Sequence, residues 1–568
     1  MLDSYLKRDV APRLDLGSAA LRQALLLALA CTAVVGLPVL SIFASFIDGP
    51  ASAETLRHLA ATIIPQALLE TAILSVGVVI GVVTLGAATG WLAATCDFPG
   101  RRVFEWALLL PLAMPAYIVA YAYTDALQFA GPVQTALREA FGWRRGDYWF
   151  PEIRSLAGGA FVFSVVLYPY VYLLARTAFL ARTASMIDAA RSLGLSPWQT
   201  WWHVNIPLAR PAIAAGALLA LMETLADYGA SVYFGLQTFT VAIYRAWFSL
   251  GDRMAASQLA AVLLLLVLGI LVLERHARGR ARFFTPTASQ RPAARAVLHG
   301  GAAAAAFAAC VLPVLLGFVL PVVLLLRLLL PAWNTVDWSR FVHWLVNTVG
   351  IAIGGAAIVL ITVMGLAYAA RAAERGLPAW LVRVSVRLMS LGYALPGAVV
   401  AVGILIPLAT FDNALDGMLK NAIGIGTGLL LTGSVFALLY GYLVRYFAVA
   451  YQSVEAGLSR ITPTMDASAR SLGSSTFDTF VRVHLPILAP SVLAAVLLVF
   501  VDVMKELPAT LVLRPFNFDT LAVVAYQLAA DERLAEAALP ALTIGAVGVL
   551  PVVLLSRAIA RAAGPGHA

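Results

Sequence analysis

The sequence contains few charged residues and few cysteines. Only 12% of its 568 residues are Asp, Glu, Lys or Arg, about half the share found in a soluble globular domain. The three cysteines, Cys31, Cys96 and Cys310, lie in or beside apolar runs and form no CxxC pair. Such scattered cysteines predict neither a disulfide framework nor a zinc site. The composition therefore excludes a soluble globular protein and a small disulfide-bonded scaffold.

Sequence motifs of common catalytic sites are also absent. The chain contains no GxxxxGK[ST] phosphate-binding loop, no HExxH and no GxSxG. We therefore expect no ATP hydrolysis, no cofactor and no metal site in this chain itself. The seven histidines are scattered, and we interpret His203 and His484 as surface residues. These features predict a protein that is not an enzyme.

Long apolar runs, by contrast, are abundant. Hydrophobic residues make up 61% of the chain, and the mean hydropathy is +0.87. Runs of about 20 residues, each long enough to cross a bilayer, occur at twelve places. They lie near 23–47, 67–94, 103–127, 156–180, 209–235, 257–274, 302–328, 344–370, 384–409, 426–450, 488–513 and 539–560. We therefore predict an all-α polytopic membrane protein with about 12 transmembrane helices.

The distribution of basic residues predicts the orientation in the membrane. An even number of spans places both termini on one side, and with this topology Lys and Arg favour that side by roughly two to one. The net charge of +9 therefore reflects membrane topology, and we expect no nucleic-acid partner. We predict a multi-pass protein in the lipid bilayer with both termini in the cytoplasm.

The chain has the pattern of a duplicated unit. Residues 274–298 are rich in Arg and contain no long apolar run, which predicts a cytoplasmic linker between halves 1–273 and 299–568. LAMPAYIVA (112–120) matches YALPGAVVA (393–401), each with a proline early in a span. We predict two parallel six-helix repeats with a transport pathway at their interface.

A polar segment also occurs twice, each time after the fourth span of a half. The copies are AARSLGLSPWQTWWHVNIPLARPA (189–212) and SARSLGSSTFDTFVRVHLPILAPS (468–491). Each predicts a short helix that ends at a glycine, followed by a proline that begins the next span. These are Gly194 and Pro207 in the first copy, and Gly473 and Pro486 in the second. Such a segment could anchor in lipid headgroups or dock a partner, and its duplication favours a two-fold partner.

Four acids occur in the fifth spans, where charge is expensive. Glu223 and Asp227 in the first half match Asp502 and Glu506 in the second. The spacing i, i+4 places each pair on one helix face, in the outer half of the membrane. The acids could pair with Lys505 or Arg245 to fix helix packing. Alternatively, they could form a vestibule that favours cations, since carboxylates repel oxyanions and suit hard cations such as Fe(III).

The repeated segments resemble the EAA loop of binding-protein-dependent ABC importers. DAARSLG with VNIP carries Asp188 where that family has Glu, whereas ASARSLG with VHLP has Ala467 there and Asp466 beside it. The resemblance implies that each loop places a coupling helix in a cleft of an ATPase subunit. The residues that it assigns to this contact are Asp188, Ala189, Ala190, Arg191, Gly194, Pro207, Asp466, Ala469, Arg470, Gly473 and Pro486.

Three other stretches resemble fused ferric-iron importer permeases. They are YPYVYLLARTAF (168–179), METLADYGASVYFG with TFTVAIYRAWF (222–248), and KELPATLVLRPFNFDTLA (505–522). This resemblance implies a permease subunit of the type I ABC importer fold in the bacterial inner membrane. It would carry ferric iron from the periplasm to the cytoplasm.

The same resemblance implies the partners. They are a cytoplasmic ATPase homodimer, which binds ATP and Mg, and a periplasmic iron-binding protein. Related permeases for thiamine or polyamines remain alternatives, whereas sulfate and molybdate fit four acids badly. An alternative of another class is an ion-coupled secondary transporter with 12 helices, which has no need for two matched cytoplasmic loops.

Overall fold

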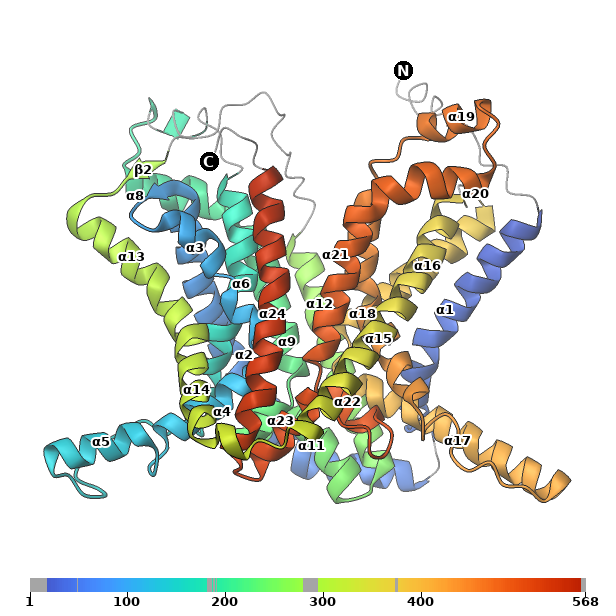
Figure 1. Ribbon diagram of the computed structural model, residues 1–568, viewed down its shortest axis with the longest axis horizontal. Coiled ribbons are helices and arrows are strands. Elements are labelled where there is room, and N and C mark those ends of the chain that lie inside the picture. The colour runs from blue at the N-terminus through green and yellow to red at the C-terminus, as the bar shows by residue number, and fades with distance from the viewer. Residues whose placement is uncertain are drawn as a thin grey trace.

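The computed structural model describes residues 18–47, 50–180, 186, 189–190, 192–278, 295–372 and 376–562. Figure 1 shows these residues as helices that run side by side through one slab. The first half contains α1 (Ser18–Ala44), α2 (Pro50–Thr95), α3 (Arg101–Ala107), η1 (Leu110–Ala113), α4 (Ala116–Leu127), α5 (Pro132–Phe141), α6 (Leu156–Leu180), α8 (Pro197–Thr200), η2 (Trp201–Asn205), α9 (Ile206–Ala226), α10 (Gly229–Tyr233), α11 (Phe239–Tyr244), η3 (Arg245–Ser249) and α12 (Arg253–Arg278).

The second half follows a similar order. It contains α13 (Gly300–Val314), η4 (Leu315–Val319), α14 (Leu320–Ala332), η5 (Trp333–Thr335), α15 (Trp338–Ala372), α16 (Gly376–Leu391), η6 (Gly392–Ala394), α17 (Gly397–Ile423), α18 (Val435–Leu458), α19 (Pro463–Ser471), α20 (Thr476–Thr479), η7 (Phe480–His484), α21 (Leu485–Met504), α22 (Pro508–Leu513), α23 (Leu521–Ala530) and α24 (Leu534–Ala562).

The polytopic helical fold predicted from the apolar runs is confirmed. Within the described residues, ten helices are long and apolar enough to cross a membrane, and a bent pair, Arg101–Ala113 with Ala116–Phe141, could form an eleventh. Each of the twelve predicted runs overlaps a helix. The tenth run is filled by α18, which begins nine residues later than predicted and carries Arg445 and Glu455 among its apolar residues.

Prolines break the third span of each half at matching places. Pro115 precedes α4 and Pro396 precedes α17, and each proline has extended backbone with ψ near 140° (φ −59°, ψ 142° and φ −56°, ψ 141°). A proline cannot donate a backbone hydrogen bond and disfavours helix for the residue before it. The chain therefore ends one helix, bends, and starts another. At the first break the two helices differ in direction by 88°.

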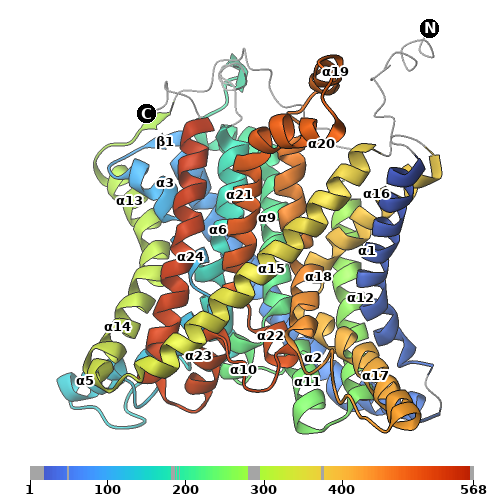
Figure 2. The same ribbon diagram turned by 45° about the vertical axis from the view of Figure 1, so that its right-hand side comes forward.

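The two halves interlock through their first helices (Figures 1 and 2). Helix α1 packs against α16 and α17 of the second half, where the Ser41 hydroxyl donates to the Gly403 carbonyl at 2.7 Å. In the reverse exchange, α14 packs beside α4, and the Tyr123 hydroxyl donates to the Leu316 carbonyl at 2.6 Å. Each half is therefore completed by a helix of the other.

The described ends of the predicted linker are attached to the first half. Helix α12 continues to Arg278, so the linker begins as helix. At its other end, strand β2 (Ala296–Val297) pairs in parallel with β1 (Cys96–Asp97), which follows α2. The division of the chain at 274–298 stays a prediction from the sequence repeat.

We predict that the contact between α1 and α17 depends on the absence of a side chain at Gly403. A Cβ there would lie 2.6 Å from the Pro38 carbonyl oxygen and 3.0 Å from Ile42 Cδ1. Gly403→Ala should therefore destabilise the protein by about 1–3 kcal/mol, a typical cost of overpacking. Gly417→Ala in the same helix, where nothing lies within 4 Å, serves as the matched control. Thermal unfolding in detergent measures both, and equal melting temperatures would contradict the prediction.

Candidate functional site

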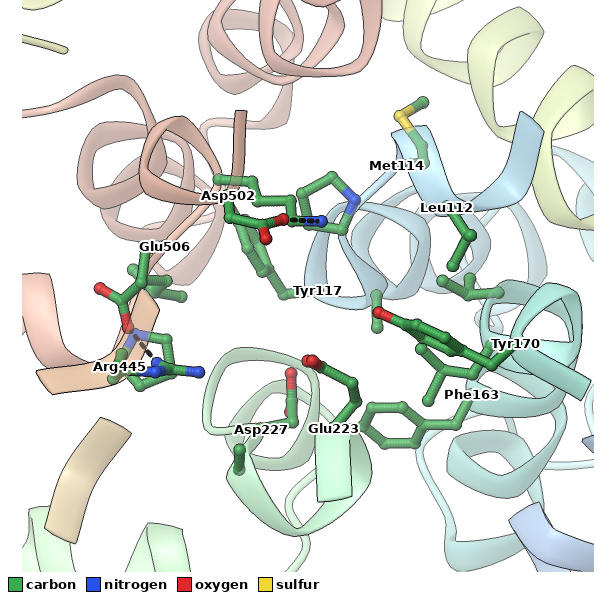
Figure 3. Close-up of a pocket in the computed structure, with 18 of the residues that line it drawn as sticks. Leu112, Met114, Tyr117, Phe163, Tyr170, Glu223, Asp227, Arg445, Asp502 and Glu506 are labelled. Atoms are coloured by element: carbon green, nitrogen blue, oxygen red, sulfur yellow. Dashed lines mark hydrogen bonds and ion pairs between the residues drawn. The ribbon is translucent and has the colours of Figure 1, made fainter. Parts of the chain in front are cut away.

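A cavity of about 120 Å³ lies between the two halves. Figure 3 shows its charged side chains pointing inward from both halves. The four acids predicted from the sequence, Glu223, Asp227, Asp502 and Glu506, all line it. The structure therefore brings together residues that lie 279 positions apart in the two repeats.

The sequence spacing predicted that the two acids of each half share one helix face. This prediction was wrong. Helix α9 ends at Ala226, before Asp227, and α21 ends at Met504, before Glu506. The physical reason is that the second acid of each pair accepts hydrogen bonds from the next short helix, whose first N–H groups have no partner within the helix. Asp227 accepts from the Ser231 N–H at 3.0 Å in α10.

Glu506 accepts hydrogen bonds from the start of α22 in the same way, and it accepts more of them. Its carboxylate accepts from the backbone N–H groups of Ala509 and Thr510, both at 2.8 Å, and from the Thr510 hydroxyl. Because two carboxylates satisfy backbone groups at these breaks, both fifth spans can end inside the protein and leave irregular backbone against a cavity.

The second-half acids are also paired with cations. Arg445 Nη1 of α18 lies 2.6 Å from Glu506 Oε1, and both side chains are almost fully buried. Lys505 Nζ lies 2.8 Å from Asp502 Oδ1, which confirms the neighbour predicted from the sequence. Arg245, the other predicted partner, donates instead to the Gln237 amide oxygen at 3.2 Å.

The first-half acids have no such partners. Glu223 accepts a hydrogen bond from the Tyr393 hydroxyl at 3.2 Å, and in the described part of the chain neither Glu223 nor Asp227 forms an ion pair. At the repeat spacing of 279 positions, Val166 and Ala226 stand where the second half has Arg445 and Lys505. With all groups ionised, the cavity thus holds four carboxylates against two cations, and the excess negative charge lies on the first-half wall.

This charge pattern can attract a cation without holding it permanently. Among the described residues no group of three or more His, Cys, Asp and Glu side chains could ligate a metal ion. A transport pathway needs an attraction that draws the ion in but still releases it. Two carboxylates that form no ion pair within the described residues, beside two that do, meet both requirements.

Four tyrosines that the sequence reasoning missed complete the walls. They are Tyr117, Tyr170, Tyr393 and Tyr446. Two of them lie beside the span-breaking prolines Pro115 and Pro396. The repeated proline was therefore a usable signal, since a helix broken inside a membrane commonly borders a cavity.

The repeated polar segments form matching loops on one face of the protein. In the described part of the first loop, Ala190 is buried whereas Ala189 and Leu193 are exposed. In the second loop, Ala469 is buried and Leu472 is exposed. Asp188 and Arg191 lie outside the described residues, and the described backbone of Arg470 lies in α19.

Glycine ends the predicted helix in both loops. Gly194 has φ of 77° and Gly473 has φ of 81°, left-handed values that glycine adopts without the steric cost of a Cβ. The prediction of glycine at the C-terminal turns is therefore confirmed. The prolines also lie where predicted, with Pro207 and Pro486 each the second residue of α9 and α21.

A wider helical turn precedes each of these prolines. It spans Trp201–Asn205 in η2 and Phe480–His484 in η7, because a proline cannot donate to the carbonyl of the turn before it. An aromatic residue at the start of each wide turn contacts the second span of its half, α2 or α15. Trp201 contacts Trp91 at a ring distance of 6.2 Å, and Phe480 contacts Tyr368 at 5.1 Å.

The interpretation of His484 as a surface residue was wrong. His484 is 5% exposed, and Asp466, which the resemblance assigns to the coupling loop, is 6% exposed. His484 Nε2 lies 2.6 Å from Asp466 Oδ1, and Arg371 Nη2 lies 2.6 Å from Asp466 Oδ2. Burial alone would raise the pKa of the Asp466 carboxyl, but the hydrogen bonds with Arg371 and His484 outweigh it and hold that pKa below its usual value. Asp466 is therefore an internal anion.

Taken together, these features define a class of membrane protein. Many apolar helices lie side by side in one slab, two interlocked halves enclose a charged cavity, and two matching loops lie on one face, at opposite sides of it (Figure 1). This is the architecture of a transport permease.

Comparisons with known proteins give the family. Residues 83–274 match the family model of the binding-protein-dependent transport system inner membrane component. The chain is 26% identical to the Fe(3+)-transport system permease protein FbpB 2 of Haemophilus influenzae, over 87% of this chain and 90% of that one. It is 24% identical to the putative ferric transport system permease protein FbpB 1 of the same organism, over 84% and 75%. The molybdenum transport system permease protein ModB of Escherichia coli is 26% identical over 33% of this chain and 82% of its own length.

These matches agree with the resemblance seen in the loops. Residues 83–274 form a domain of the binding-protein-dependent transport system inner membrane component, and the chain is similar over most of its length to permeases named for ferric transport.

We predict that Glu506 stabilises the fold more than Glu223 does. Glu506→Gln removes the counter-charge of buried Arg445, and losing one partner of a buried ion pair costs about 3–5 kcal/mol. Glu223→Gln leaves no cation unpaired and is the matched control. Thermal unfolding of the two purified variants in detergent compares them. An equal, small loss for both would show that the Arg445 pair contributes little.

Proposed function

We propose that this permease carries ferric iron from the periplasm to the cytoplasm through the cavity between its halves. The observation that carries the proposal is the charge of that cavity, four carboxylates against two cations, with Glu223 and Asp227 unpaired among the described residues. An excess of carboxylate favours cations over oxyanions, and oxygen ligands suit a hard cation such as Fe(III).

Similarity to two relatives named for ferric transport supports the same cargo. They are 26% and 24% identical to this chain over 87% and 84% of its length. Thiamine and polyamines are also cations, and the four cavity tyrosines suit organic cations through their ring faces. They are therefore the competing cargoes that a transport assay must include.

Energy and cargo would come from partner subunits. A cytoplasmic ATPase homodimer that binds ATP and Mg would dock on the two loops, and a periplasmic iron-binding protein would deliver the ion to the opposite face. The matching turns at Gly194 and Gly473 support two equivalent docking sites. Helix α1 begins and α24 ends on the face that carries these loops (Figure 1). This agrees with an inner-membrane protein whose termini and loops all face the cytoplasm.

The geometry suggests how the cavity would act during transport. Closure of the ATPase dimer would move the two loops, and the interlocked halves would rock about the cavity between them. Glu223 and Asp227 would attract the ion. Arg445 and Lys505 would limit the total negative charge, so that the ion leaves when the cavity opens to the other side.

We predict that the unpaired acids are needed for uptake but not for assembly. The double variant Glu223→Gln/Asp227→Asn should lower iron uptake about tenfold, equivalent to about 1.4 kcal/mol, because the cavity loses its excess negative charge. Glu139→Gln, on the exposed part of α5, is the control. Uptake of radiolabelled ferric iron by cells, with labelled thiamine and putrescine in parallel, is the measurement. Unchanged iron uptake would contradict the prediction and would indicate that these acids have only a structural role.

We also predict that the loop glycines are needed for docking. Gly194→Pro and Gly473→Pro cannot keep a positive φ, since proline holds φ near −65°, so each should reduce co-purification of the ATPase. Gly424→Pro is the matched control, because Gly424 ends α17 with φ of 72° on the opposite face. Normal co-purification of both loop variants would contradict docking at these loops.

A further inference from the structure

One face of helix α4 carries three buried hydroxyl groups that have no hydrogen-bond partner among the described residues. They belong to Tyr117, Tyr121 and Thr124, which are 4%, 2% and 0% exposed. The spacing i, i+4, i+7 places all three on one side of the helix. Because each unpaired buried hydroxyl destabilises a fold, three together on one face indicate a function other than packing.

The missing hydrogen bonds are a property of this face of α4. A threonine in a membrane helix can donate its hydroxyl to the carbonyl four residues earlier, as Thr84 and Thr224 do at 2.7 and 2.8 Å. Within the described part of the chain, Thr124 makes no such bond. On the other side of α4, the Tyr123 hydroxyl donates to the Leu316 carbonyl at 2.6 Å. The unpaired hydroxyls of α4 therefore all lie on one side.

The second half does not repeat these hydroxyls. The span-breaking prolines Pro115 and Pro396 are 281 positions apart, and at that spacing Ala398, Val402 and Leu405 of α17 match the three hydroxyl residues. Helix α17 thus follows the same kind of break with apolar side chains at all three positions. The break itself does not require the hydroxyls of α4.

The row of hydroxyls begins at the cavity. Tyr117 lines the cavity together with Asp227 (Figure 3). Tyr121 and Thr124 follow about 6 Å and about 10 Å further along the helix axis. The ring of Tyr121 contacts that of Tyr233 in α10, with ring centroids 4.5 Å apart. We call this row of three hydroxyls the hydroxyl strip, and it leads from the cavity acids along α4.

Helix α10 covers the hydroxyl strip in this structure. It contacts α4, and a Cβ at Gly229 of α10 would lie 2.8 Å from Tyr117 Cβ. The absence of a side chain at Gly229 therefore lets α10 lie directly on the start of the strip. Both α10 and α23, which also contacts α4, lie toward the face opposite the two loops (Figure 2).

Helix α10 is bounded by backbone breaks and joined to the second half. It begins after the break at Asp227 and is soon followed by Gly235, whose φ is 74°. The Tyr228 hydroxyl before it lies 3.1 Å from the Tyr526 hydroxyl in α23 of the second half. Helix α10 can therefore follow the second half when the halves separate, and so leave α4.

We propose that the hydroxyls of Tyr117, Tyr121 and Thr124 line the outer passage to the cavity and bind the hydrated cation when α10 moves off α4. Phenol and alcohol oxygens accept hydrogen bonds from the water shell of a cation, and oxygen ligands suit a hard cation such as Fe(III). In the closed arrangement the hydroxyls stay unpaired, which lowers the free energy needed to open the passage. This inference rests on the proposed transport of a cation through the cavity.

Thiol labelling tests whether the passage opens. Thr124→Cys places a thiol in the hydroxyl strip, and Ala122→Cys places one at an equally buried position on the other side of α4. The complex with its ATPase and binding protein, in lipid nanodiscs, is treated with a charged thiol reagent, with and without ATP and vanadate. The unaltered chain, whose cysteines are buried, gives the background.

ATP and vanadate should accelerate the labelling of Thr124→Cys about tenfold, within the range of coupling between distant sites. Ala122→Cys should stay slow in both states. Equal rates for Thr124→Cys with and without ATP and vanadate would overturn the inference, because the strip would then stay covered.

Removal of the hydroxyl oxygens tests cation binding. Tyr117→Phe/Tyr121→Phe should lower iron uptake about tenfold, equivalent to about 1.4 kcal/mol. Its melting temperature should not fall, because the lost hydroxyls are unpaired. Tyr123→Phe, which loses a bonded hydroxyl of the same helix, is the matched control. It should melt at a lower temperature but keep iron uptake per folded molecule.

The outcomes distinguish this inference from the proposed function. Thiol labelling does not depend on the cargo, so an opening passage together with unchanged iron uptake by Glu223→Gln/Asp227→Asn would remove the proposed role of the acids alone. Unchanged iron uptake by Tyr117→Phe/Tyr121→Phe would overturn the inference. A fall in melting temperature as large as that of Tyr123→Phe would also overturn it, since the hydroxyls would then serve packing.

Discussion

Backbone hydrogen bonding in a low-dielectric environment is the constraint on which the rest of this structure depends. An unpaired N–H inside a membrane costs several kcal/mol, so a spanning helix can end there only where another group accepts its bonds. Asp227 and Glu506 supply that acceptor beside α10 and α22. The breaks that they permit open the cavity, and the buried charge of Glu506 in turn requires Arg445.

The two repeats have diverged in where they place paired charge. In the second half, cations lie beside the cavity acids, whereas the first half has Val166 and Ala226 at the matching positions. The backbone breaks, the loop glycines and the aromatic contacts are nevertheless repeated. Features that set the fold are thus shared, while the electrostatic features differ between halves.

Much of this arrangement was predictable because it depends on local chemistry. Apolar runs predicted the spans, and glycine and proline at fixed spacing predicted the loop turns. The break between Ala226 and Asp227 was not predictable from helix periodicity, since the acid's partners are N–H groups that come after it in the chain. Arg445 was missed because its partner Glu506 lies 61 positions away. His484 looked like a surface residue for the same reason, as its environment is made by distant segments.

The exchange of first helices has a consequence for biosynthesis. Helix α1 is made early, yet its hydrogen-bond acceptor at Gly403 lies 362 positions later in the chain. A growing polypeptide therefore holds α1 in lipid, with the Ser41 hydroxyl bonded only within its own helix at the Pro38 carbonyl, until α16 and α17 have been inserted. The first half cannot reach its final packing before most of the second half exists. Because both halves belong to one chain, α16 and α17 are inserted close to α1.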